Sequence, residues 1–141
     1  MAAGYSGTPL LQKLGIKPDG KVAVIGAPAG VLPVPLASRA PFDVIVCFVT
    51  KRADLAKHLA TQRPRLAQDG GLWIAWPKAS SKVPTEVTEN TVRELALPTG
   101  LVDNKVCAID ETWSGLRLVI RRELRTPVTP RRRASARSAG R

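Results

Sequence analysis

The sequence is poor in the residues that build metal, redox and hydrolytic centres. Among 141 residues it has two cysteines and one histidine. Cys47 and Cys107 lie far apart in apolar runs and form no CxxC pair, so we expect two reduced core thiols and no metal site. His58 lies in a predicted helix with no second histidine or cysteine nearby and no serine in a strand-to-helix elbow for it to activate, so we expect it on the helix surface. Without an HExxH motif or a Walker loop, metalloenzyme, hydrolase and NTPase activities are disfavoured.

Long hydrophobic runs are also missing. No apolar stretch approaches the roughly 20 residues that a membrane span needs. The opening MAAGYSGTPL lacks the basic and apolar regions of a signal peptide. These absences predict a cytoplasmic protein without a membrane partner, and the length suits one domain.

Acidic residues are absent from position 124 onward. This stretch holds six of the arginines, whereas the whole chain has a net charge of +11. Proline, small residues and like charges predict a disordered basic tail at 124–141 after a folded domain at 1–123. Arg131, Arg132 and Arg133 could bind nucleic-acid phosphates without sequence specificity, but a tail that serves solubility explains them equally well.

Apolar runs bounded by turn residues predict five strands. The first three are apolar on both faces, which is typical of parallel strands covered on both sides. The last two are only about four residues apart, so they should form an antiparallel hairpin. The predicted strands span 21–25, 43–50, 72–77, 101–110 and 114–122.

Helices are predicted between these strands. Thr8 and Pro9 favour a short helix that Gly15 ends. Residues 51–68 have helical spacing, with a kink or restart expected at Pro64, and 69–71 should form a turn. Thr88 is suited to cap a third helix, which Pro98 and Gly100 stop; Val92, Leu95 and Ala96 should face inward.

Several phrases resemble the class I methyltransferase layout. LGIKPDGKVAVIGA resembles its opening strand, FDVIVCFV its fourth strand, QDGGLWIAWP its fifth and GLVDNKVCAIDETWSGLRLVIRR its final hairpin. The resemblance implies that the second and third strands are missing. It predicts a three-layer, Rossmann-like α/β fold with strand order 1-2-3-5-4, strand 5 antiparallel and helices on both faces.

At closer range, the wording resembles DUF3052, a bacterial family of unknown function. The phrases that carry this resemblance are YSGTPL, LGIKP, FVTKRADL, LWIAWPKASSKVPTE and the final hairpin. They cover about residues 5–123. The family has no activity to carry over.

The segment Gly26–Gly30 occupies the place of a cofactor-binding glycine loop. It lacks the GxGxxG spacing, and Pro28 removes one N–H donor. The next acid, Asp43, begins a strand, whereas a ribose-binding carboxylate would follow one. We therefore interpret the segment as a structural turn, and we do not expect S-adenosylmethionine or NAD to bind there.

A second candidate site is the rim formed by the carboxyl ends of the strands, where ligands of open α/β sheets bind. Its cations, acid and indoles suit an anionic or aromatic ligand, or a protein partner. They equally suit solvated loops and indoles that plug the sheet end. The rim residues are Thr50, Lys51, Arg52, Trp76, Lys78, Lys82, Glu111 and Trp113.

Three functions are compatible with these features. The first is a non-catalytic, Rossmann-like binding or interaction domain, which the weak glycine loop favours. The second is a small enzyme or sensor that holds an anionic metabolite at the rim. The third is a nucleic-acid accessory protein that acts through the basic tail.

Overall fold

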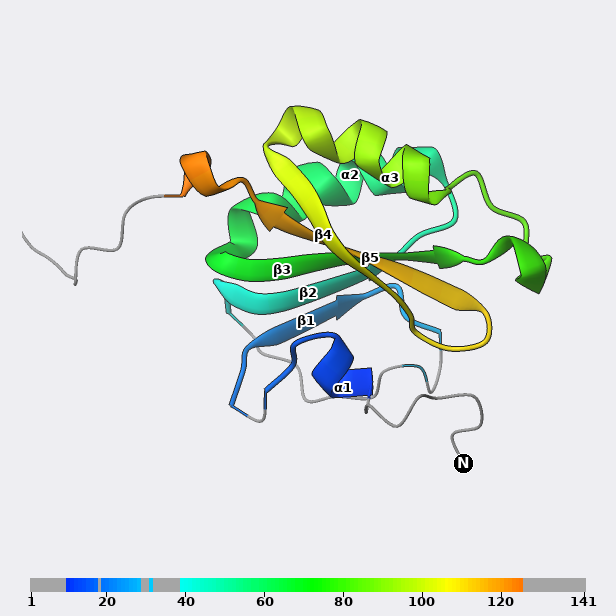
Figure 1. Cartoon of the computed structure of the whole chain (residues 1–141), viewed down its shortest axis with the longest axis horizontal. Coiled ribbons are helices and arrows are strands. Elements are labelled where there is room, and N and C mark those ends of the chain that lie inside the picture. The colour runs from blue at the N-terminus through cyan, green and yellow to red at the C-terminus, as the bar shows by residue number, and fades with distance from the viewer. Residues whose placement is uncertain (1–9, 18, 29–30, 32–38, 126–141) are drawn as a thin grey trace, which may run out of the picture.

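The computed structural model describes residues 10–17, 19–28, 31 and 39–125. Its strands form one mixed sheet in the order β1-β2-β3-β5-β4, which confirms the predicted order (Figure 1). β1, β2 and β3 are parallel, whereas β5 runs antiparallel to both β3 and β4. The strands are β1 (Val22–Ile25), β2 (Phe42–Phe48), β3 (Leu66–Pro77), β4 (Leu101–Ala108) and β5 (Trp113–Ile120).

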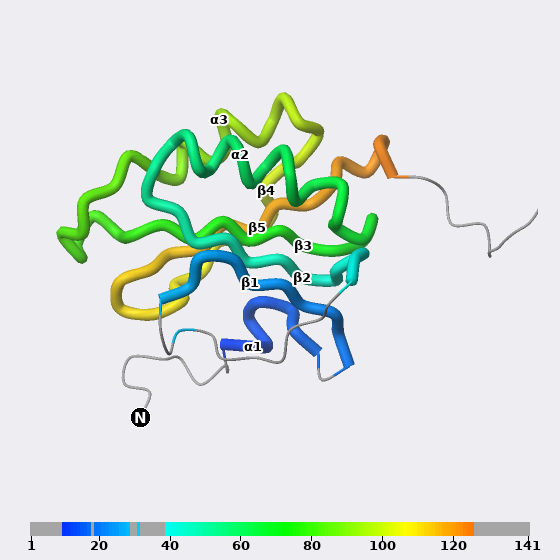
Figure 2. The backbone as a smooth tube through the Cα atoms, turned by 180° about the vertical axis from the view of Figure 1, so that it is seen from behind, coloured from blue at the N-terminus to red at the C-terminus, as the bar shows by residue number. Residues whose placement is uncertain are grey.

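Helices cover both faces of the sheet and make three layers. α2 (Arg52–Gln62) and α3 (Glu89–Ala96) lie side by side on one face, and α1 (Leu10–Lys13) lies on the other (Figures 1 and 2). Alternate residues of each central strand enter two separate cores. Because both faces are buried, β2 from Val44 onward and β3 from Leu72 onward are apolar, as the sequence predicted.

Trp73 joins α1 to the sheet. This fully buried residue of β3 packs in the core under α1, and its indole Nε1 donates a hydrogen bond to the Leu14 carbonyl oxygen at 3.0 Å. Gly15, next along the chain, has a positive φ of 80° and ends the helix as predicted. Thr8 and Pro9 lie outside the described residues.

The third helix is capped as predicted. The Thr88 side chain accepts a hydrogen bond from the Thr91 N–H, and the Thr91 hydroxyl accepts one from the Thr88 N–H. Val92 and Ala96 are buried, and Gly100 follows with a φ of 89°.

The prediction was wrong between α2 and β3. α2 ends at Gln62, and the expected restart at Pro64 is a single 3-10 turn, Arg63–Arg65, rather than a helix that continues to residue 68. β3 begins at Leu66 and includes residues 69–71, which were predicted to form a turn. The strand is irregular here: Phe42 of β2 pairs with Leu66, but Val44 already pairs with Gly71. The glycines therefore serve close strand approach rather than chain reversal.

The scarce reactive residues lie mostly where expected. Both cysteines are free; Cys47 is buried, and burial raises the pKa of its thiol to about 12. Cys107 packs against the core under α1 but is only half-buried, because β4 lies at the sheet edge. His58 is half-buried in α2 rather than fully on the surface. Within the described ranges, no group of side chains could hold a metal ion, and no helix is long and apolar enough to cross a membrane.

Candidate functional site

The chain's own loop covers the rim at the end of β2. The Thr50 carbonyl oxygen accepts hydrogen bonds from the Glu86 N–H at 2.8 Å and from the Thr85 hydroxyl at 3.3 Å. Glu86 in turn accepts from the Arg52 N–H at 2.9 Å, and the Arg52 guanidinium pairs with Glu94 of α3 at 3.3 Å. The segment between β3 and α3 is therefore fastened over the point where α2 begins.

The two indoles of the predicted rim lie on opposite faces of the sheet. Trp76 is buried in the core beneath α2 and α3. Trp113 packs on the α1 side, where its ring meets Phe48 edge-on at 5.1 Å between centroids. The indoles thus do not converge on one ligand.

The remaining rim residues are spread over surface loops. Lys78 is half-buried beside the β4–β5 turn, where its N–H donates to the Thr112 carbonyl oxygen at 2.8 Å. Lys51, Lys82 and Glu111 are exposed. A ligand role for this set stays a prediction. Arg131, Arg132 and Arg133 lie outside the described residues.

Gly26 lies where the ends of two strands approach closely. Its φ is +74°, and a Cβ built there would lie 3.0 Å from the Phe48 carbonyl oxygen. The residue thus brings the end of β1 against the end of β2. Ala29 and Gly30 of the same segment lie outside the described residues.

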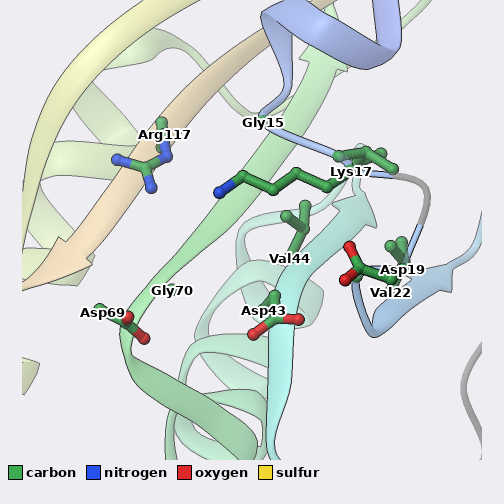
Figure 3. A pocket seen from close by; sticks show the side chains of 11 residues that line it. Gly15, Lys17, Asp19, Val22, Asp43, Val44, Asp69, Gly70 and Arg117 are labelled. Carbon is green, nitrogen blue, oxygen red and sulfur yellow. The ribbon is translucent and has the colours of Figure 1, made fainter.

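A pocket of about 400 Å³ lies at the opposite end of the sheet, at the amino ends of the parallel strands (Figure 3). We call it the amino-end pocket. It is bounded by the α1–β1 loop, the starts of β1 and β2, and the irregular part of β3. Its lining consists of Gly15, Ile16, Lys17, Asp19, Gly20, Val22, Asp43, Val44, Asp69, Gly70 and Arg117.

Glycines hollow out this pocket. Gly15, Gly20 and Gly70 contribute no side chains to its lining. At Gly70 a Cβ would lie only 2.7 Å from the Asp43 carbonyl oxygen. Gly71, beside it, leaves room for an arginine: a Cβ there would lie 2.9 Å from the Arg117 Cζ. The floor of the pocket at Gly70 is therefore bare backbone of β3.

Two cations face this floor without an acidic partner. Arg117 projects from β5 on the side of Trp73, its cross-strand neighbour. Neither Arg117 nor Lys17 forms an ion pair within the described part of the chain. Burial lowers the pKa of the Arg117 guanidinium, and the charge of Arg125 lowers it further. Arg117 nonetheless remains a cation at neutral pH.

Three carboxylates complete the polar lining. Figure 3 shows Lys17 extended toward the Arg117 guanidinium, with Asp69 and Asp43 across the pocket from it and Asp19 near the β1 start. One oxygen of Asp43 is engaged, because it accepts the Lys21 N–H at 2.8 Å. The pocket thus has a cationic side and an acidic side.

A second pocket, of about 260 Å³, lies beside Arg117. Lys13, Asn104 and Lys105 contribute to its lining, and it shares Gly15 and Arg117 with the amino-end pocket. The Lys105 ammonium donates to the Lys13 carbonyl oxygen at 2.9 Å. Arg117 therefore lines both pockets.

Sequence reasoning missed the amino-end pocket because it inspected only the carboxyl ends of the strands. One signal was present. Arg117 interrupts an apolar strand, GLRLVI, and the paired strand offers two adjacent glycines at 70–71. A long cation opposite bare backbone is a pattern that could have indicated a hollow.

The fold and its strand order define a Rossmann-like α/β domain with the layout of class I methyltransferases. The chain belongs to the family described as "Protein of unknown function (DUF3052)", whose model matches residues 38–122. The predicted family is therefore confirmed. No curated protein matches the sequence.

Similar solved structures are methyltransferase-like and larger. The structure of LepI in complex with SAM has a TM-score of 0.51 and 12% identity, over 81% of this chain and 47% of that one. Aeropyrum pernix fibrillarin, with bound S-adenosyl-L-methionine, has a TM-score of 0.44 and 19% identity, over 58% of this chain and 38% of that one. The ribosomal protein L11 methylase of Lactobacillus delbrueckii has a TM-score of 0.43 and 13% identity, over 60% of this chain and 39% of that one. The chain spans less than half of each, and the likeness establishes the fold alone.

Proposed function

We propose that this domain is a non-catalytic binding domain, not an enzyme that uses S-adenosylmethionine or NAD. The observation that carries this proposal is the covered end of β2. Ligands of open α/β sheets bind outside the carboxyl ends of the strands. Here Glu86 and Thr85 bind the Thr50 backbone, and Glu86 and Glu94 bind Arg52. A ligand at this point would have to displace the protein's own hydrogen bonds.

The turn after β1 supports the same proposal. Phosphate and ribose recognition in such folds needs a glycine loop whose N–H groups face open space. A Cβ built at Gly26 would lie 3.0 Å from the Phe48 carbonyl oxygen, so the close approach of the two strand ends accounts for this glycine without a ligand. Pro28, two residues on, has no N–H to donate.

The test is isothermal titration calorimetry of the full chain with S-adenosylmethionine, its demethylated product and NAD. We expect no binding at micromolar concentrations. The near-ultraviolet circular dichroism of the tryptophans, which include the buried Trp73, checks that the sample is folded. A lack of binding then cannot be due to unfolded protein. A micromolar dissociation constant for any of the three compounds would overturn the proposal.

A further inference from the structure

We propose that the amino-end pocket binds a small molecule that carries an oxyanion, as a phosphate or carboxylate, together with hydroxyl or amino donors. This inference rests on the proposed function and names a site and a ligand class for it. The site lies at the end of the sheet away from the carboxyl rim.

Arg117 supplies the first part of the argument. A half-buried guanidinium has lost part of its hydration, and an acidic partner normally offsets that loss. Arg117 has no such partner among the described residues, and Arg125 adds a like charge nearby. Its planar fork of N–H donors matches a carboxylate or phosphate in two parallel hydrogen bonds. A bound oxyanion would give the guanidinium the direct partner that no carboxylate of the pocket provides.

Lys17 points to the same conclusion. It comes from the α1–β1 loop, far from Arg117 in sequence, yet lines the same pocket and extends toward the guanidinium (Figure 3). Two cations that approach one another repel, and an anion held between them reverses the sign of that interaction. A second cation also distinguishes this place from an isolated surface arginine.

The acidic side restricts the rest of the ligand. Asp69 and Asp43 line the pocket across from the cations (Figure 3), and a carboxylate can only accept hydrogen bonds. Groups that face them must therefore be hydroxyl or ammonium donors. A second oxyanion at this side would be repelled. The pattern favours a sugar phosphate or an amino acid over a simple anion or a polyphosphate.

The volume agrees with a ligand of this size. At about 400 Å³ the pocket falls in the lower part of the range that small-molecule sites occupy.

The experiment is calorimetric titration of the full chain with glucose 6-phosphate, serine, inorganic phosphate and glucose at one ionic strength. We expect glucose 6-phosphate or serine to bind more tightly than phosphate, and glucose not to bind. Arg117→Gln should weaken the binding by about tenfold or more, because a charge-assisted hydrogen-bond pair is lost. Lys17→Gln should weaken it by a smaller factor.

Two matched variants serve as controls. Arg122→Gln removes an exposed arginine just beyond the same strand, and Lys78→Gln removes a lysine of the carboxyl rim. Neither should change the affinity. If Lys78→Gln weakens binding as much as Arg117→Gln does, or if none of the oxyanions binds, the assignment to the amino-end pocket is wrong.

The two proposals fail in different ways. Micromolar binding of S-adenosylmethionine that Arg117→Gln leaves unchanged would overturn the proposed function but not the anion site. If none of the oxyanions binds, the proposed anion site is wrong, whatever the titrations with S-adenosylmethionine and NAD give.

Discussion

Gly70 occupies the place in the sheet where an added methyl group would meet the most backbone. A Cβ there would lie 2.7 Å from the Asp43 carbonyl oxygen and 3.1 Å from that of Ala67. These atoms belong to main chain that pairing holds in place. Gly70→Ala should therefore lower the free energy of unfolding by about 2 kcal/mol, as overpacking does.

Gly15→Ala is the matched comparison. Its φ of +80° strains any L side chain, but nothing lies within 4 Å of the new methyl group. We expect a loss of about 1 kcal/mol from backbone strain alone. Urea denaturation of both variants measures the two losses. An equal or smaller loss at Gly70 would show that β2 and β3 can separate freely there.

The buried thiol of Cys47 makes stability depend on alkaline pH. Its pKa is raised from an ordinary value of 9.0 to about 12 in the folded protein. The unfolded chain therefore releases this proton first, and stability that is complete below pH 9.0 is lost as the pH rises toward about 12.

Cys47→Ala should flatten this dependence. Above about pH 9, the wild-type free energy of unfolding should fall more steeply than that of the variant, by up to about 1.4 kcal/mol per pH unit. Cys107→Ala is the control, because Lys105 and Lys13 oppose the effect of burial on the pKa of that half-buried thiol. If the free energies of unfolding of the wild type and Cys47→Ala fall in parallel above about pH 9, the Cys47 thiol is not the source of the alkaline pH dependence.

Among the elements, α3 has a side-chain cap at Thr88, the residue just before the helix begins. Thr88→Ala removes the acceptor for the Thr91 N–H and should cost about 1 kcal/mol of stability. Thr88→Ser keeps the hydroxyl and should cost less. Thermal unfolding followed by circular dichroism compares the two; equal losses would mean that the hydroxyl contributes nothing.

The same helix shows what local sequence can predict. Thr88, the inward spacing of Val92 and Ala96, and the stop at Gly100 are properties of neighbouring residues, so the sequence contained them. The strand order followed from apolar runs together with the family resemblance. These parts of the fold needed no knowledge of distant contacts.

The start of β3 could not be predicted in this way. Asp69, Gly70 and Gly71 have the composition of a turn, yet pairing with β2 draws them into the strand. The amino-end pocket depends on that outcome, because Arg117 reaches it from the far end of the sequence. Pairing between β3 and β2 thus outweighs the local turn preference of residues 69–71, and the amino-end pocket forms as a result of that pairing.

At the scale of the whole molecule, the charge is unevenly distributed along the chain. Residues 126–141, outside the described structure, contain five arginines and no acid. Leu124 and Arg125 belong with the domain: Arg125 Nε donates to the Ile120 carbonyl oxygen at 2.9 Å. A chain that ends at Arg125 therefore tests the tail while keeping this contact.

We predict that the full chain binds duplex DNA weakly and that the shortened chain binds it less. The logarithm of the full chain's affinity should fall with the logarithm of salt concentration, with a slope of about −4, because each neutralised phosphate releases counterions. Gel-shift titrations at several salt concentrations measure both. Equal binding by the two chains would remove the nucleic-acid role.

The position of β1 at the sheet edge sets an order of local opening. With four residues and a single partner strand, β1 can detach while β2, β3 and β5 remain paired. Its amide protons should therefore exchange with solvent sooner than those of β3. Val22 and Gly20 also form a wall of the amino-end pocket, so a ligand there would slow this exchange by holding the edge closed. Ligand binding would then be measurable as slower amide exchange along β1, although only Val22 of that strand lines the pocket.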